Sequence, residues 1–210
     1  MELPARRLRR AVQIRLRTTA ARPTTLSAVA SVDLQRYLGD WNQVAAIPQI
    51  FQIQCARNSR ATYTAIDAST IGVRNTCSTW LGFSSAVTGQ AKVLDPTTNA
   101  QLRVSFNGIP NFGDTSQPNY VITYLSPDYS TAIVGDPARR SGFVLSRTPD
   151  LQGITWSQVR DIVTERGYDA CRFRVTPVAG GQWVLSNGGK YKNDLVIVSN
   201  AEAKKKGLDV

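Results

Sequence analysis

Three cysteines are the side chains whose spacing bears most directly on chemistry. Cys55, Cys77 and Cys171 lie too far apart for a zinc ribbon, and no Cys-x-x-Cys is present. The chain has no His, which removes the usual general base, the commonest metal ligand and the usual proximal haem ligand. Catalytic triads that need an imidazole are therefore excluded, and we expect no metal, no cofactor and no enzymatic activity.

The simplest account of these cysteines is one disulfide and one remaining thiol, which favours an oxidising compartment. Three reduced cysteines in a cytosolic protein are the alternative. Cys55 directly precedes one strand of a predicted hairpin, and Cys77 follows the end of the next strand. Both should lie near the same rim of the fold.

A second candidate contact joins Trp41, in Tyr37-Leu38-Gly39-Asp40-Trp41, to Arg147, in the segment 143–149. An Arg guanidinium that lies flat on a buried indole is worth about 0.5 to 2 kcal/mol. A Gly-x-Trp and a strand Arg also occur by chance. If the two residues do meet, the first and last strands are neighbours, as in a closed β-barrel.

The segment between these residues has the alternating pattern of short antiparallel strands separated by turn residues. Eight strands are predicted, at 41–47, 60–66, 71–75, 87–94, 101–106, 120–125, 129–134 and 142–147. Closing such a sheet on itself removes its exposed edges. We therefore predict an all-β fold, an eight-stranded antiparallel up-and-down barrel.

One helix is predicted after the barrel, beginning at the capping-box residue Thr155 and ending at Gly167. Its apolar stripe, Trp156, Val159, Ile162, Val163 and Arg166, should pack on the outside of the sheet. The run 171–175 should form a ninth, edge strand with its arginines in solvent.

The net charge of +10 belongs mainly to the ends of the chain. Residues 1–32 carry seven Arg against Glu2, and Lys204, Lys205 and Lys206 lie near the C-terminus. We divide the chain into a basic leader (1–32), disordered or targeting, a barrel with its helix (33–176) and a Gly-rich then Lys-rich extension (177–210). The leader has three interpretations: a degenerate export signal, a transit-like peptide or a plain basic arm.

No apolar run approaches the roughly 20 residues that span a bilayer, so a soluble or peripheral protein is expected. The basic ends could attract an anionic membrane surface or nucleic acid. Because the barrel itself is nearly neutral, we favour solvated ends and expect no nucleic-acid partner. A monomer or weak dimer is expected.

The chain resembles the lipocalins, in particular the bacterial-type branch that includes outer-membrane lipoprotein lipocalins, plant temperature-induced lipocalins and apolipoprotein D. The matching segments are 33–41, 44–48, 61–63, 127–137 and 144–149, and the resemblance extends over about 33–176. The family often has Tyr where this chain has Asn42. That departure leaves open how the start of the first strand is hydrogen-bonded.

The resemblance implies a cup, closed by the segment 34–38, that carries or scavenges a fatty acid, a lysophospholipid or a similar hydrophobic ligand. It implies a role in membrane upkeep, and a location in the cell envelope or outside the cell. Relatives tie the start of the second strand to the C-terminal segment, which would pair Cys55 with Cys171. It also implies structural roles for Gly39, Trp41, Asp128, Tyr129 and Arg147.

Ligand contacts are expected from side chains that share a strand face with other apolar residues, although core packing alone would explain each of them. The candidates are Tyr63, Val104, Phe106, Tyr120, Ile122, Tyr124 and Phe143, with Phe51 and Ile53 in a loop over the open end. An enzyme on the same barrel is the competing function. It would need a low-pKa Cys or a buried carboxylate, whereas the Asp residues fall mostly at turns.

Overall fold

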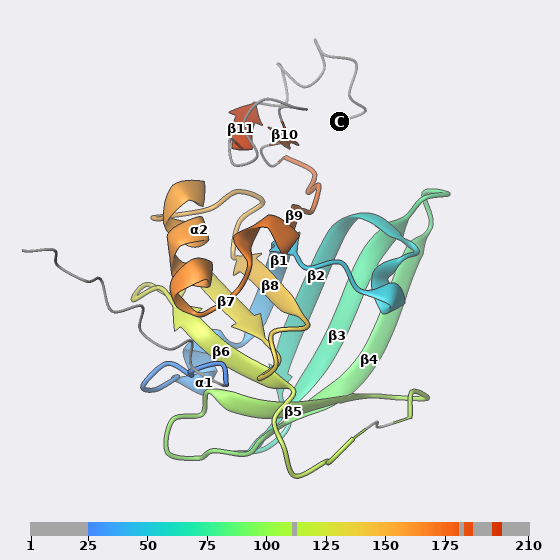
Figure 1. The fold of residues 1–210 in the computed structure, drawn as a ribbon. Helices are drawn as coiled ribbons and strands as arrows, with labels where there is room; N and C mark the ends of the chain where they lie inside the picture. Colours follow the sequence, from blue (N-terminus) through green and yellow to red (C-terminus); the bar gives the residue numbers. More distant parts are fainter. Residues whose placement is uncertain (1–24, 111–112, 181–182, 187–194, 199–210) are drawn as a thin grey trace, which may run out of the picture.

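The computed structural model describes residues 25–110, 113–180, 183–186 and 195–198. Its centre is a β-barrel of eight antiparallel strands (Figure 1). The strands are β1 (Gly39–Ala46), β2 (Cys55–Ala65), β3 (Thr70–Thr79), β4 (Ser84–Val93), β5 (Gln101–Phe106), β6 (Tyr120–Leu125), β7 (Thr131–Gly135) and β8 (Gly142–Ser146). Consecutive strands pair throughout, so the predicted up-and-down topology is confirmed.

Strand β1 closes the barrel because it pairs with both β2 and β8. Asn42 lies opposite Arg60 on one side and Ser146 on the other. Its Nδ2 donates to the carbonyl oxygens of Ser146 (3.4 Å) and Arg147 (3.3 Å), and its Oδ1 accepts from Arg60 Nη2 at 3.5 Å. The residue that departs from the family pattern thus links the three strands at the seam.

Strands β2 to β4 extend further toward one end of the barrel than the apolar pattern indicates. The β3–β4 ladder continues from Asn75 to Ser78, opposite Val87 to Ser84. These rim positions are rich in Ser and Thr, so no apolar alternation marks them in the sequence. The longer strands carry Cys55 and Cys77 inside the sheet rather than beside it.

Helix α2 (Trp156–Glu165) begins and ends as predicted. Thr155 and Gln158 form a capping box, and Gly167 adopts a positive φ of 83°. Val159 and Val163 are buried against the outer surface of the barrel. No helix within the described ranges is both long enough and apolar enough to cross a membrane.

The ninth strand is shorter than predicted. Strand β9 (Arg174–Val175) pairs with Ala45 and Ala46 of β1, while Cys171 lies in a 3-10 helix, η2 (Ala170–Arg172). The Asp169 side chain accepts a hydrogen bond from the Cys171 N–H, which holds this turn and delays the start of the strand. The arginines of this segment are exposed, as expected.

Residues on both sides of the segment 33–176 also pack on the barrel. Leu26 and Val32 are buried, and residues 25–32 run along the barrel, with Leu26 N–H bonded to Pro137 O and Val32 N–H to Thr98 O. Val178 is buried beyond the other boundary. Strands β10 (Trp183–Ser186) and β11 (Leu195–Val198) pair with each other as a separate sheet. Residues 1–24 and the Lys204–Lys206 run lie outside the described residues.

Candidate functional site

The interior of the barrel is a single apolar cluster to which all eight strands contribute. It contains every sequence-predicted ligand contact on the strands except one: Tyr63, Val104, Phe106, Tyr120, Ile122 and Phe143. A second cluster lies between the outer wall and α2, and includes Val44, Val144 and Val163. The two clusters thus show which residues of each alternating strand face the interior of the barrel and which face outward.

Tyr124 is the exception, and its predicted place beside Tyr120 and Ile122 is wrong. The pairing of β6 with β7 shifts between Ile122 and Tyr124, so Thr123 is the extra residue of a β-bulge. Tyr124 consequently packs with the outer cluster, on the side of α2. A bulge of one residue reverses the face of every residue after it.

Three tyrosines meet in the interior near the closed end. Tyr120 Oη lies 2.8 Å from Tyr37 Oη and 2.9 Å from Tyr63 Oη. Tyr37 comes from the short helix α1 (Leu34–Tyr37), whereas the other two come from β6 and β2. Within this tyrosine trio, two hydrogen bonds use two of the three hydroxyl protons. The third proton can be donated to an acceptor outside the trio.

Burial keeps these phenols neutral. Desolvation raises the pKa of Tyr63 to about 12, and it raises the pKa of Tyr37 and Tyr120 well above the ordinary value. The trio is therefore a neutral hydrogen-bonding group in otherwise apolar surroundings. Such a group can bind the polar end of an apolar molecule.

Trp41 and Arg147 seal the closed end of the barrel. The guanidinium carbon lies 3.9 Å from the indole centroid, and Trp41 is fully buried. Arg147 also donates to the carbonyl oxygens of Arg36 (2.7 Å) and Asp40 (2.9 Å). Gly39 stands beside this contact with a φ of 91°, which favours glycine, and an added Cβ would lie 3.4 Å from Arg147 Nη1.

A second stacked pair supports this floor. The guanidinium of Arg36 lies 3.9 Å from the ring centroid of Tyr129, whose hydroxyl accepts a hydrogen bond from Asp33 N–H. Next to it, Asp128 Oδ1 accepts hydrogen bonds from Ser126 Oγ, Ser130 N and Ser130 Oγ. These bonds stabilise the carboxylate and lower its pKa to about 2.

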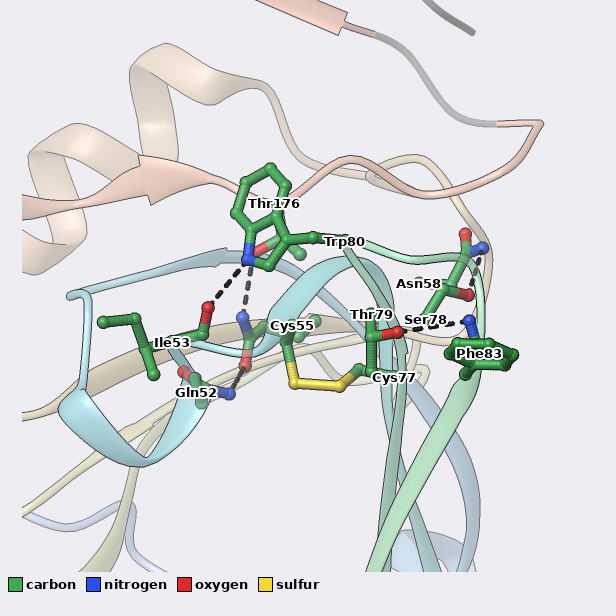
Figure 2. The surroundings of a disulfide bond; sticks show 11 residues. Gln52, Ile53, Cys55, Asn58, Cys77, Ser78, Thr79, Trp80, Phe83 and Thr176 are labelled. Atoms are coloured by element: carbon green, nitrogen blue, oxygen red, sulfur yellow. Dashed lines mark hydrogen bonds between the residues drawn. A yellow bond between two sulfur atoms is a disulfide. The ribbon is translucent and has the colours of Figure 1, made fainter.

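The opposite end carries the disulfide and the loops that border the mouth. Cys55 is bonded to Cys77, the residue expected near the same rim, and not to Cys171, the partner that the family resemblance implies (Figure 2). The 3-10 helix η1 (Ile50–Gln52) lies in the loop between β1 and β2. Phe51 and Ile53 lie in this loop and are exposed, with 61% and 74% of their surface accessible.

Several residues of the site are missing from the sequence-based set. Tyr37 belongs to the floor segment, but nothing in its spacing indicates that it meets Tyr63 and Tyr120. Asn75 shares a face of β3 with the buried Ile71 and Val73, and its Oδ1 is buried without a partner among the described residues. Trp80 could have been found, because it begins an apolar turn, Trp80-Leu81-Gly82-Phe83, that lacks polar turn residues.

A closed eight-stranded barrel with an apolar interior, a plugged floor and a helix on its outer wall defines a class of cup-shaped binding proteins. Within that class the chain belongs to the lipocalin family, because the lipocalin-like domain matches residues 32–178. Proteins of this family bind small hydrophobic ligands.

The matched region covers most of the length of each relative. Temperature-induced lipocalin-1 of Arabidopsis thaliana is 34% identical over 160 residues, which cover 72% of this chain and 82% of that protein. The outer membrane lipoprotein Blc of Escherichia coli is 29% identical, with the same coverage. Among solved structures, insecticyanin of the tobacco hornworm has a TM-score of 0.56 at 18% identity, covering 72% of this chain and 83% of that one, which shows the fold alone.

Proposed function

We propose that this protein binds a small, mainly apolar ligand with one polar end, and carries or scavenges it without chemical change. Fatty acids and lysophospholipids are the first candidates. The tyrosine trio is the observation that supports this proposal most directly, because it gives an apolar interior one neutral hydrogen-bonding group at its closed end. We infer that the apolar chain of the ligand points toward the mouth.

Apolar contact supplies the affinity in this proposal. Each square ångström of ligand surface taken from water contributes about 25 cal/mol. Val104, Phe106 and Phe143 are only half-buried in the interior cluster, so they have surface left to give to a ligand. The trio then selects among apolar molecules by their polar end, since a neutral phenol can donate to a carboxylate, a carbonyl or a hydroxyl.

The proposed setting is the cell envelope or the extracellular space. The disulfide supports an oxidising compartment, and one relative is named as an outer membrane lipoprotein. A role in membrane upkeep is part of this proposal.

The test uses two tyrosines on opposite faces of β6. We infer that Tyr120, whose oxygen can accept from both Tyr37 and Tyr63, is the phenol that donates to the ligand. Tyr120→Phe removes this donor, and we expect it to weaken fatty-acid binding about fivefold, as for the loss of one hydrogen bond of about 1 kcal/mol to the ligand. Tyr124→Phe removes a hydroxyl from the outer face and is the matched control. Displacement of an apolar fluorescent probe measures both, and native mass spectrometry of the purified protein identifies any ligand that copurifies.

A pure hydrocarbon has no polar end, so Tyr120→Phe should leave its binding unchanged. Equal losses for the hydrocarbon and the fatty acid would contradict the assigned role of the trio but not the carrier function. The carrier function itself fails if neither fatty acids nor lysophospholipids displace the probe from the wild-type protein.

A further inference from the structure

Large apolar side chains that are exposed to solvent gather at the open end of the barrel. Among the described residues eight are exposed, and only Ile66 lies at the closed end. Ile109 is on the β5–β6 loop. The other six form what we call the apolar rim, on the adjacent β1–β2 and β3–β4 loops: Ile50, Phe51, Ile53, Trp80, Leu81 and Phe83.

The apolar rim is held in its exposed arrangement by contacts between and beneath the two loops (Figure 2). Trp80 Nε1 donates a hydrogen bond of 2.7 Å to the carbonyl oxygen of Ile53, across the two loops. Beneath this bond, the disulfide joins the first residue of β2 to β3. Gln52 Nε2 donates to Gln43 Oε1 at 2.8 Å, which ties η1 to the barrel wall. In this arrangement all six apolar side chains are exposed to solvent.

Charge is distributed around the rim in a pattern that suits a lipid surface. Residues 47–54 and 79–84 contain no ionisable side chain. Four exposed arginines surround these loops at the same end of the barrel. Arg57 lies opposite Ser78 near the end of β3, Arg140 is next to Gln49, Arg172 donates to the Arg140 carbonyl, and Arg174 pairs with the last residue of β1.

Carboxylates are concentrated at the other end. The turns and short segments of the closed end hold Asp33, Asp40, Asp67, Asp95, Asp128 and Asp150. The described loops of the open end hold half as many, Asp114, Asp136 and Asp169, and Asp136 lies 3.6 Å from Arg140 Nε. A negatively charged surface would attract the molecule with its open end foremost.

We propose that the apolar rim docks the protein, mouth first, onto a bilayer surface that contains anionic lipids. The six apolar side chains enter the interfacial region, where Trp is favoured, and the surrounding arginines contact lipid phosphates. A second copy of the chain fits less well, because a symmetric pair of rims would bring two sets of these arginines together. Docking does not depend on the proposed ligand, although it would place the mouth of the cup against the lipid.

The test measures binding of the full-length protein to phosphatidylcholine vesicles, with and without phosphatidylglycerol, by flotation. The double variant Ile50→Asp/Leu81→Asp puts charge at two highly exposed positions and should weaken binding roughly tenfold or more. Ile66→Asp makes the same kind of change at the closed end and should bind like the wild type. Arg57→Gln/Arg140→Gln should weaken binding to the anionic vesicles alone, by roughly fivefold for each arginine.

Emission from Trp80 gives an independent readout. Vesicles should shift the wild-type emission to the blue, and Trp80→Phe should abolish most of that shift while the Ile66→Asp protein retains it. This readout and the arginine variant carry the test if the double variant does not fold, which circular dichroism would reveal.

Three results would overturn the proposal. The first is failure of the wild type to float with anionic vesicles. The second is vesicle binding by folded Ile50→Asp/Leu81→Asp that equals that of the wild type, which would assign binding to the basic ends of the chain. The third is a wild-type dimer in sedimentation velocity that the double variant lacks, without vesicle binding, and the rim would then be a self-association surface.

Discussion

Arg147 stabilises the closed end of the barrel because its planar guanidinium both covers the indole of Trp41 and donates to two backbone carbonyls of the floor. We expect Arg147→Ala to lower the free energy of unfolding by about 2 kcal/mol, from the lost stacking and the carbonyls left without a donor. Arg147→Lys should recover only part of this, since an ammonium cannot lie flat on the ring. Urea unfolding measures both.

Arg74 is a suitable control for that experiment, because it is an exposed arginine on β3. Arg74→Ala should change the stability by no more than about 0.5 kcal/mol. If it cost as much as Arg147→Ala, a general effect of charge would explain both losses, and the sealing role of Arg147 would be refuted.

Asp128 makes part of the stability dependent on acid pH. Its pKa is about 2 in the folded protein against an ordinary 3.8, because the carboxylate accepts three hydrogen bonds in the β6–β7 turn. A lowered folded-state pKa stabilises the protein above the unfolded value, and this contribution is lost as the pH falls from about 4 to about 2.

Asp128→Asn should therefore be less stable than the wild type at pH 6, and the two proteins should converge near pH 2. Urea midpoints measured across this range test the prediction. A difference in stability that stays constant with pH would mean that the substitution acts through packing and not through the charge.

At the scale of elements, the disulfide joins β2 to β3 where their pairing is irregular. The register shifts between Cys55 and Arg57 and again before Arg60, so hydrogen bonding alone holds this end of the pair less regularly. A link across a sequence separation of 22 contributes about 3 kcal/mol by loop entropy. The covalent bond compensates for an interrupted ladder.

Cys55→Ser and Cys77→Ser should each lower the free energy of unfolding by about 3 kcal/mol. Cys171→Ser should change it by less than about 0.5 kcal/mol, because this exposed residue lies outside the disulfide. Mass spectrometry of a non-reduced digest should yield a peptide that links Cys55 to Cys77. Recovery of a peptide linking Cys55 to Cys171 would contradict the observed pairing.

The fold was largely predictable from the sequence, because barrel strands alternate with period two and the motifs around Trp41 and Arg147 identify the closing strands. The strand ends at the rim were not, since Thr76, Cys77 and Ser78 carry no apolar pattern. The face of Tyr124 could not be predicted, because the β-bulge before it contains no Gly or Pro that would mark it in the sequence. The tyrosine trio brings together residues up to 83 positions apart, a contact that spacing alone does not reveal.

For the whole molecule, closure at β1 has a consequence for how the chain folds. Asn42 meets its partner Ser146 across 104 positions, about half of the sequence, so the last pair of strands joins residues that are synthesised far apart in time. Such non-local pairing slows folding. During synthesis β1 must wait, with one edge unpaired, until β8 leaves the ribosome, and over that interval the nascent sheet is open to pairing with other chains.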